Sequence, residues 1–297
     1  MRDELSSAQI ESYRENGFVV IEDFLDDHEV GHLRETVAAA VAARGDALTP
    51  RDFHAQREQA RHRAVSSLQV ADRQQLLVAF SKRRPSWLRV LSQHMNLWQT
   101  DERLREFCLD PRLGRMACEL GGLDGVRLWH DQTMHKPAWG EPTGWHFDTP
   151  TFSFSHPWTS TFWYALVDTD LRNGCMHYIR GSHKLQLRTK GNWRLDGLRL
   201  LHPEWDAADP VPCPVRAGAL IVHNGDAAHG AGANMTPRSR PAYTMTWMPV
   251  GSTFNGTPNI LPDEILATIA VGDPLEYDDL FPVVYSVEDT PVYPRLP

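Results

Sequence analysis

The opening of the chain alternates polar and apolar positions in a way that predicts a helix, a short strand and a second helix. Ser6 and Gln9 match the capping box of a first helix, and Gly17 is expected to stop that helix before the β-branched residues 19–21. Asp26 can cap the second helix, whose apolar residues recur at helical spacing. These apolar residues are Val30, Leu33, Val37 and Val41.

The chain becomes polar and rich in arginine after Gly45, where the second helix is expected to end. Residues 46–99 have the composition of an insertion that covers the core. Residues 101–120 again show apolar positions at helical spacing, and Pro111 divides them into two short predicted helices. We therefore expect residues 1–125 to form a mostly helical cover.

Short β-rich runs separated by Gly, Pro, Asn and Asp begin at residue 126, which is typical of an antiparallel sandwich or barrel. The runs are residues 126–135, 145–148, 161–167, 176–179, 219–223 and 242–248. Residues 187–215 form a long connection of the kind that acts as a lid, and residues 251–297 form a proline-rich tail that can wrap the domain or mediate dimers. Because no repeat or flexible linker interrupts the chain, we predict one domain over residues 1–297. It belongs to the α+β class and has a mainly β core at residues 126–250.

Composition and charge restrict the classes of protein that fit. A hydrophobic content of 41% is ample for a packed core, and the longest uninterrupted apolar run, residues 37–43, is too short to cross a bilayer or direct secretion. A formal net charge of −8 without a Lys/Arg-rich run disfavours nucleic acid as a partner. The 4 cysteines form no CxxC pair and favour reduced thiols. We therefore expect a cytoplasmic protein, monomeric or homodimeric, that acts on a small molecule and binds neither nucleic acid nor a membrane.

Three residues predict a metal site with positions left open. His146 and Asp148 lie two positions apart in a strand-like run, so the period of a strand directs both to one face. One such pair is weak evidence, and a competing His-x-Glu pattern begins at His202, although a proline makes it a poor strand. His229 can supply a second imidazole from a distant strand. Two histidines and one carboxylate suit Fe(II) in an oxygenase better than a closed structural zinc site.

Arg240 opens the last β-rich run, eleven residues after His229. If its side chain points into the barrel, the alternation of a strand directs three small residues inward with it and three large ones outward onto the helices. The inward residues are Ala242, Thr244 and Thr246, and the outward residues are Tyr243, Met245 and Trp247. One guanidinium among small side chains describes a cavity that can hold a dicarboxylate through a bidentate, charge-assisted pair.

These motifs resemble the phytanoyl-CoA dioxygenase family of Fe(II)/2-oxoglutarate oxygenases over nearly the whole chain. The resemblance is carried by the segments LSSAQIESYRENGFVVIEDFLDDHEV, TGWHFDTP, NGCMHYIRGSHK and HGAGANMTPRSRPAY, which occur in the family's order and spacing. It implies a double-stranded β-helix of the jelly-roll or cupin type. It also implies that His146, Asp148 and His229 are the iron ligands.

The resemblance further implies how the cosubstrates are used. Arg240, and not the neighbouring Arg238, would hold 2-oxoglutarate, and Gln132 and Trp163 match positions that contact this cosubstrate in relatives. The implied reaction consumes O₂ and 2-oxoglutarate and releases succinate and CO₂. We predict that it oxidises, by hydroxylation, a C–H bond of a small-molecule metabolite.

Three positions bear on how far the resemblance extends. Arg180 stands where relatives commonly have proline, and Ala231 replaces a serine often found two residues after the distal histidine. Thr244 is a candidate to replace that lost hydroxyl as a contact to the cosubstrate. Asp148 is retained, whereas related halogenases lack this carboxylate, so the resemblance favours hydroxylation or desaturation over halogenation.

Several alternatives remain open from the sequence. One is a cupin-like metal enzyme that does not use 2-oxoglutarate, and another is a metal-free binding module on the same scaffold. A third is a related oxygenase that performs desaturation, cyclisation or rearrangement. His183 and His223 are expected to be hydrogen-bonded structural residues. The roles of His130, His135 and His177, and that of Arg180, stay open between substrate contact and structure.

Overall fold

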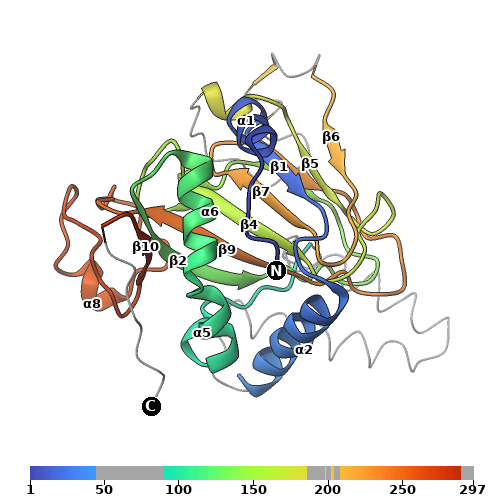
Figure 1. The fold of residues 1–297 in the computed structure, drawn as a ribbon, viewed down its shortest axis with the longest axis horizontal. Coiled ribbons are helices and arrows are strands. Elements are labelled where there is room, and N and C mark those ends of the chain that lie inside the picture. Colours follow the sequence, from blue (N-terminus) through green and yellow to red (C-terminus); the bar gives the residue numbers. More distant parts are fainter. Residues whose placement is uncertain (45–89, 186–197, 199–201, 204–207, 289–297) are drawn as a thin grey trace, which may run out of the picture.

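A computed structural model describes residues 1–44, 90–185, 198, 202–203 and 208–288, which form two antiparallel sheets and a layer of helices (Figure 1). The predicted combination of helices with antiparallel strands is confirmed. Two of the predicted features, the insertion at residues 46–99 and most of the connection at residues 187–215, lie largely outside the described residues.

Local sequence signals determine where the helices begin and end. The helices are α1 (Ser7–Asn16), α2 (Asp27–Ala43), α5 (Glu102–Cys108), α6 (Pro111–Gly121) and α8 (Asp263–Leu266). Ser6 and Asp26 each form a capping box, and Gly17 ends α1 with a φ of 83°, a conformation that favours glycine. Pro111 is the first residue of α6, where its missing N–H costs nothing. Gly45, the predicted end of α2, lies outside the described residues.

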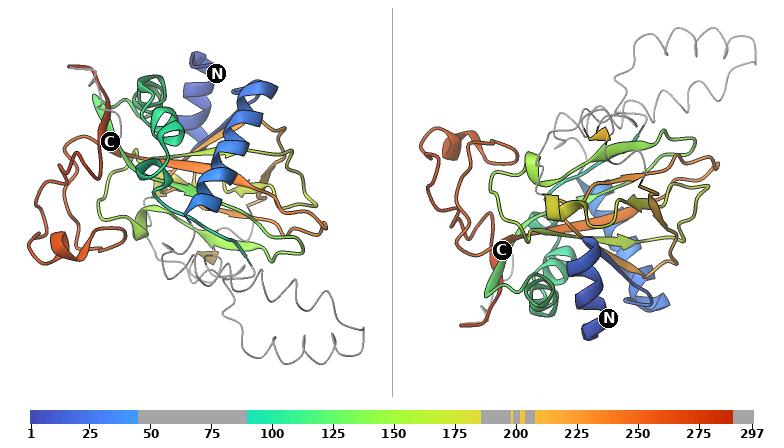
Figure 2. Two further views of the ribbon diagram at one scale, coloured as in Figure 1. Left: turned by 90° about the horizontal axis from the view of Figure 1, so that it is seen from below. Right: turned by 90° about the horizontal axis from the view of Figure 1, so that it is seen from above.

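The larger sheet has six strands in the order β1-β7-β4-β9-β2-β10. Their bounds are β1 (Phe18–Ile21), β7 (Leu220–Asn224), β4 (Ser160–Ala165), β9 (Ala242–Pro249), β2 (Gly125–Thr133) and β10 (Val283–Ser286). Helices α1, α2, α5 and α6 cover one face of this sheet (Figure 2). The predicted outward residues of β9, Tyr243, Met245 and Trp247, are buried in the cluster that joins this face to the helices, which confirms their direction.

The smaller sheet lies across the other face of the larger one (Figure 2). Its strands are β3 (Thr143–His146), β8 (His229–Ala231), β5 (Met176–Tyr178) and β6 (Val211–Cys213), in the order β3-β8-β5-β6. One buried apolar cluster joins Trp163, Ile221 and Ala242 of the larger sheet to Met176 and Tyr178 of the smaller sheet. The two sheets therefore share one interior.

Three segments differ from the sequence prediction. Strand β3 ends at His146, so Asp148 lies beyond the predicted strand at residues 145–148, with helical backbone angles (φ −78°, ψ −45°). The predicted connection at residues 187–215 contains strand β6. The predicted tail contributes helix α8 and strand β10, and β10 pairs with β2 at the edge of the larger sheet.

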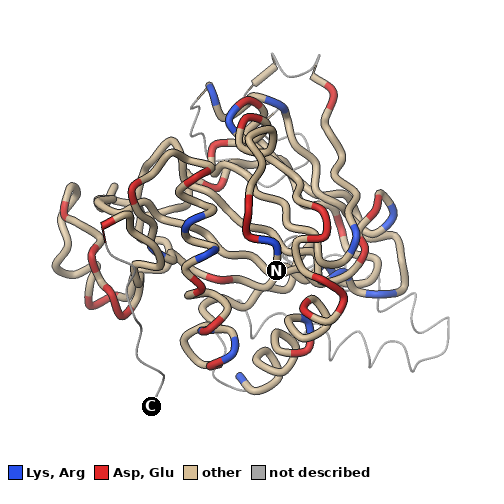
Figure 3. The backbone as a smooth tube through the Cα atoms, in the orientation of Figure 1, with Lys and Arg blue, Asp and Glu red and all other residues tan. Residues whose placement is uncertain are grey.

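Charge and hydropathy add two observations. Acidic and basic residues are interspersed along the described chain (Figure 3). None of the helices in the described ranges is long and apolar enough to pass through a membrane.

Candidate metal centre

Three potential metal ligands meet in the interior between the sheets. His146 and His229 are direct register partners on the neighbouring strands β3 and β8, and Asp148 follows β3. The Nε2 atom of each histidine lies 3.6 Å from Oδ1 of Asp148. One ligand atom from each of the three residues lies within 4.8 Å of the others. The structure therefore brings together the three residues that the sequence predicts, although a turn and not a continuous strand places the carboxylate.

The backbone around the centre explains this convergence. Strand β8 approaches β3 closely at Gly230, where an added Cβ would lie only 2.9 Å from the carbonyl oxygen of Thr143. A glycine beside His229 thus permits the close pairing that sets the two imidazoles together. The N–H of Asp148 donates to the carbonyl oxygen of Gly225 at 2.9 Å, which fixes the turn after β3.

Hydrogen bonds on the far side of each imidazole determine which nitrogen faces the centre. Nδ1 of His146 lies 2.8 Å from the carbonyl oxygen of Gly144, and Nδ1 of His229 lies 2.9 Å from that of Ala227. A carbonyl oxygen only accepts, so each Nδ1 carries the proton and each Nε2 presents its lone pair to the centre. Burial lowers the pKa of both imidazoles to about 4, so both are neutral near pH 7.

Asp148 completes the donor set with a negative charge. Burial opposes its ionisation, but the three surrounding imidazoles outweigh burial and hold the pKa of Asp148 well below its usual range. Its second oxygen, Oδ2, accepts a hydrogen bond from the hydroxyl of Thr161 at 3.1 Å and lies 3.2 Å from Nε2 of His223. Two neutral imidazoles and one carboxylate are a donor set that fits Fe(II) with coordination positions left open.

Two buried cations lie beside each other at one end of the same interior. Arg240, just before β9, is 2% exposed and Lys136, just after β2, is 0% exposed. Their backbones pair through two hydrogen bonds of 3.0 and 2.8 Å. The guanidinium of Arg240 lies 5.2 Å from the ring centre of Trp163, which belongs to the cluster between the sheets.

The two cations have neutral neighbours in the part of the chain that the structure describes. Nζ of Lys136 donates to the carbonyl oxygen of Glu141 at 2.8 Å and to the hydroxyl of Thr143 at 3.2 Å. Burial and the charge of Arg240 lower the pKa of Lys136 to about 7, and burial lowers that of Arg240 to about 10. The side-chain contacts of the two cations within the described ranges go to carbonyl oxygens, a hydroxyl and an aromatic ring, and none goes to a carboxylate. Two buried basic groups with no carboxylate partner among the described residues are suited to binding an anion.

The other predicted cosubstrate residues lie on three adjacent strands of the larger sheet. Thr244 of β9 is the register partner of Gln132 on β2 and of Trp163 on β4, so the three residues form one row across the sheet. The hydroxyl of Thr244 donates to the backbone carbonyl of Gln132 at 3.2 Å. The proton of Thr244 is thus already used, and this residue can offer a cosubstrate only its lone pairs.

The histidines with open roles fall into different environments. His130 is the register partner of Thr246 on β9, and burial lowers its pKa to about 4. His135 is buried enough that its pKa is likewise lowered to about 4. His177 lies between two interior residues of β5, which directs its side chain to the outer face of the smaller sheet. His183 bonds the carbonyl oxygen of Arg14 at 3.0 Å, a structural contact away from the centre.

Sequence reasoning missed Lys136, Thr161 and Tyr178, whose hydroxyl lies 3.0 Å from Nδ1 of His223, and it underrated His223 itself. Lys136 carried no signal of its own, because its place beside Arg240 follows from backbone pairing between residues far apart in sequence. Thr161 and Tyr178 carried none, since any strand residue can face either side until the sheets are paired. His223 was expected to be structural, and the structure adds that it contacts Asp148.

Comparison with known proteins identifies the family of the chain. The model of the phytanoyl-CoA dioxygenase (PhyH) family matches residues 13–242. Phytanoyl-CoA dioxygenase domain-containing protein 1 of Bos taurus is 27% identical over 270 residues, which cover 84% of this chain and 92% of the relative. Ectoine dioxygenase of Bordetella parapertussis is 24% identical over 277 residues, which cover 85% of this chain and 78% of the relative.

Solved structures show the same similarity in three dimensions. The non-haem α-ketoglutarate-dependent carbocyclase SnoK from nogalamycin biosynthesis superposes with a TM-score of 0.71 at 25% identity, covering 95% of this chain and 97% of SnoK. The epimerase SnoN from the same biosynthesis superposes with a TM-score of 0.64 at 23% identity, covering 93% of this chain and 97% of SnoN, and shows the fold alone. Enzymes of the matched family use Fe(II), 2-oxoglutarate and O₂, and the family model spans most of the chain. The chain therefore belongs to the phytanoyl-CoA dioxygenase family and is a non-haem iron, 2-oxoglutarate-dependent dioxygenase.

Proposed function

We propose that this enzyme hydroxylates a C–H bond of a small-molecule metabolite, with His146, Asp148 and His229 as the iron ligands. One observation supports the proposal: the possible metal ligands and the buried cations Arg240 and Lys136 lie against the same apolar cluster between the sheets. His229 contacts the ring of Tyr178 and Arg240 contacts that of Trp163, and both rings belong to this cluster. When bound, the iron supplies the chemistry that couples decarboxylation of 2-oxoglutarate, yielding succinate and CO₂, to oxidation of the substrate.

The residues of the chain have separate tasks in this proposal. The neutral imidazoles and Asp148 hold the metal without surrounding it. Arg240 and Lys136 bind the distal carboxylate of 2-oxoglutarate, which directs the oxo-acid end of this cosubstrate towards the metal centre. Gln132 and Trp163 flank the cosubstrate. The facing sheets keep water from this interior, and they support our further proposal that the core is a double-stranded β-helix.

Most of the lid predicted at residues 187–215 lies outside the described residues, and its described members Leu198 and His202 are proposed to lie on the substrate side of the centre. Leu198 is buried in a cluster with Phe147, the residue between the two ligands of the β3 segment. The ring of His202 also lies 6.3 Å from that of Phe147. A cover that touches this position would exclude solvent once the substrate is bound.

Reactions other than hydroxylation can be tested in the same assay. Because the similar structure SnoK is a carbocyclase, cyclisation is a candidate for this site, and desaturation and rearrangement are alternatives that the same chemistry allows. These outcomes need the same metal centre and cosubstrate and differ in the pose of the substrate. Related halogenases lack the carboxylate that Asp148 supplies here, so its presence supports hydroxylation over halogenation.

The test begins with the purified apo-protein under anaerobic conditions. Binding of Fe(II), and then of 2-oxoglutarate to the loaded protein, is expected, and an Asp148→Ala variant should lose the first step. A metabolite panel with O₂ is then screened for substrate-stimulated release of succinate. A product that gains one oxygen atom indicates hydroxylation, loss of two hydrogens indicates desaturation or ring closure, and an unchanged mass indicates rearrangement.

The same assay separates the rival functions. Turnover without 2-oxoglutarate that survives Arg240→Leu would favour a cupin-like enzyme with another mechanism. A wild-type protein that binds no divalent metal would favour a metal-free binding module and would contradict the proposal.

A further inference from the structure

A third histidine lies against the metal centre without belonging to the ligand cluster. His223 of β7 is 2% exposed, and its Nε2 atom lies 3.2 Å from Oδ2 of Asp148. Its other nitrogen, Nδ1, lies 3.0 Å from the hydroxyl of Tyr178 on β5. The imidazole thus connects a tyrosine of the smaller sheet to the oxygen of Asp148 that faces away from the other two histidines.

The protons in this chain of contacts can be assigned. The ionised carboxylate of Asp148 only accepts, so Nε2 of His223 must donate to it. Nδ1 of His223 then has a lone pair, and the hydroxyl of Tyr178 donates to that lone pair. Burial raises the pKa of Tyr178 well above its usual value, so this hydroxyl keeps its proton. The tautomer of His223 is therefore opposite to that of His146 and His229, whose Nε2 atoms present lone pairs.

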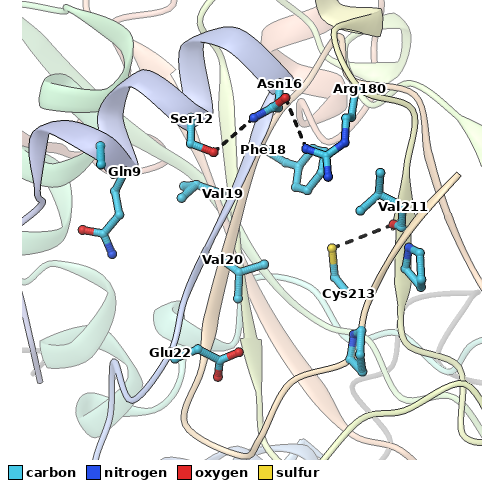
Figure 4. A pocket seen from close by; sticks show the side chains of 13 residues that line it. Gln9, Ser12, Asn16, Phe18, Val19, Val20, Glu22, Arg180, Val211 and Cys213 are labelled. Atoms are coloured by element: carbon cyan, nitrogen blue, oxygen red, sulfur yellow. Dashed lines mark hydrogen bonds between the residues drawn. The ribbon is translucent and has the colours of Figure 1, made fainter.

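The surroundings hold the two side chains in place. His223 is the register partner of Phe18 on β1 and of Thr161 on β4. The ring of Tyr178 stacks on Phe18 with centroids 4.4 Å apart and planes 13° apart. Phe18 in turn lines an open groove of about 470 Å³ between α1, β1 and β6, where the guanidinium of Arg180 lies over its ring (Figure 4). The stacked rings separate the contacts at Asp148 from the solvent of this groove.

We propose that Tyr178 and His223 are positioning residues that hold Asp148 in the orientation in which Oδ1 alone faces the metal. This inference rests on the proposed ligand role of Asp148. Thr161 gives Oδ2 a second hydrogen bond, at 3.1 Å. Because Oδ2 already accepts from two donors, it is a poor second ligand atom, and the protein supplies three donor atoms in total. The remaining positions then stay open for the cosubstrate and O₂.

The test measures metal affinity in the full-length apo-protein, with Co(II) as a probe that does not need turnover. His223→Leu removes the donor, and the Kd for Co(II) by calorimetry is expected to rise about 10–100-fold. His223→Gln is expected to recover most of that loss, because the glutamine amide can place an N–H close to the position of Nε2. Tyr178→Phe keeps the stacked ring but releases the tautomer of His223, and a several-fold, roughly 3–10-fold, rise is expected.

Two matched variants report on packing alone. His183→Leu removes a buried imidazole that bonds Arg14 and not the centre. Tyr164→Phe removes a buried hydroxyl on the helix-facing side of the sheet, where no partner lies among the described residues. Both should bind Co(II) like the wild type, and thermal unfolding of each apo-variant measures any loss of fold.

The outcomes distinguish the inference from the proposed function. If the wild type binds Co(II) but His223→Leu and Tyr178→Phe bind it equally well, the positioning role is wrong and the ligand role stands. If His223→Gln is as weak as His223→Leu, the N–H is not what matters and the inference is also wrong. If the leucine variant does not fold, the conservative Tyr178→Phe variant decides alone. A wild type that binds no Co(II) overturns both.

Discussion

Replacing Arg240 by leucine is expected to stabilise the apo-protein while removing most of its affinity for 2-oxoglutarate. The guanidinium is 2% exposed, and its hydrogen bond to the carbonyl oxygen of Met134 is long, at 3.4 Å. Its Nε atom has no partner among the described residues. The apo-protein therefore carries the desolvation cost of this charge without the compensation that a carboxylate would give.

The two magnitudes follow from this geometry. A bidentate pair with a carboxylate comprises two charge-assisted hydrogen bonds of about 1.5–3 kcal/mol each. Loss of both corresponds to a rise in Kd of roughly 10²–10⁴-fold. The lower end is expected, because removing Arg240 also raises the charged fraction of Lys136, whose pKa this arginine helps to lower. Replacing an unpaired buried charge by an apolar side chain should raise the free energy of unfolding of the apo-protein by about 1–3 kcal/mol.

Calorimetric titration of Mn(II)-loaded protein with 2-oxoglutarate measures the first effect, and urea unfolding of the apo-protein measures the second. Arg238→Leu is the matched control, because this neighbouring arginine is exposed and should change neither quantity. An Arg240→Leu protein that binds 2-oxoglutarate within about threefold of the wild type, or that is less stable as apo-protein, would refute the reasoning.

Three further predictions concern charge and burial. Lys136→Met should raise the Kd for 2-oxoglutarate about 10–100-fold. In the wild type, the affinity for 2-oxoglutarate should weaken as the pH rises through about 7, because Lys136 then loses its proton. Calorimetric titration of the Lys136→Met variant should show no such dependence on pH. The apo-protein should lose stability as the pH falls from about 6.5 towards 4, because unfolded His146 and His229 take up protons before the folded ones do. Each pKa shift is worth at most about 3 kcal/mol of unfolding free energy. Urea unfolding measures this free energy across the pH range for the wild type and for a variant with glutamine at positions 146 and 229. Equal slopes of unfolding free energy against pH in the two proteins would contradict the prediction. Asp131→Leu should destabilise the protein by about 2–4 kcal/mol in thermal unfolding, because the buried Asp131 accepts hydrogen bonds from Tyr243 and from two backbone N–H groups. Tyr243→Phe removes only one of these bonds and should cost about 1 kcal/mol. Equal losses of stability in the two variants would contradict the prediction.

Features encoded by neighbouring residues could be predicted from the sequence. The capping box predicted at Ser6 and the cap predicted at Asp26 both occur, and Asp26 proves to form a capping box as well. Each of these signals acts over only three residues. The residues of β9 alternate between the helix-covered face and the interior, because successive side chains of a strand point to opposite faces of the sheet. The association of His146 with His229 was inferred from the ligands that an open metal site needs and then from the family resemblance. Strand pairing could not be used, because the separation of the two residues in sequence says nothing of strand register.

Features that arise from packing could not be predicted. Lys136 comes to lie beside Arg240 at one end of the interior only when the backbones of these two residues pair. Asp148 reaches the centre through a helical turn, and no residue between it and His146 marks the end of β3. His177 could not be oriented because β5 has only three residues, too few for a pattern of alternation. Strand β10 has only four residues, and its partner lies more than a hundred residues away in sequence.

Strand β10 also has a consequence for how the protein behaves in concentrated solution. It forms the outer edge of the larger sheet and pairs with the first residues of β2, the strand that carries His130 and Gln132. Without residues 283–286, the N–H and C=O groups along that end of β2 would be left without partners and would offer a template for another chain. A chain shortened before this strand should therefore self-associate. By pairing with β2, residues 283–286 protect the edge of the larger sheet from pairing with another chain.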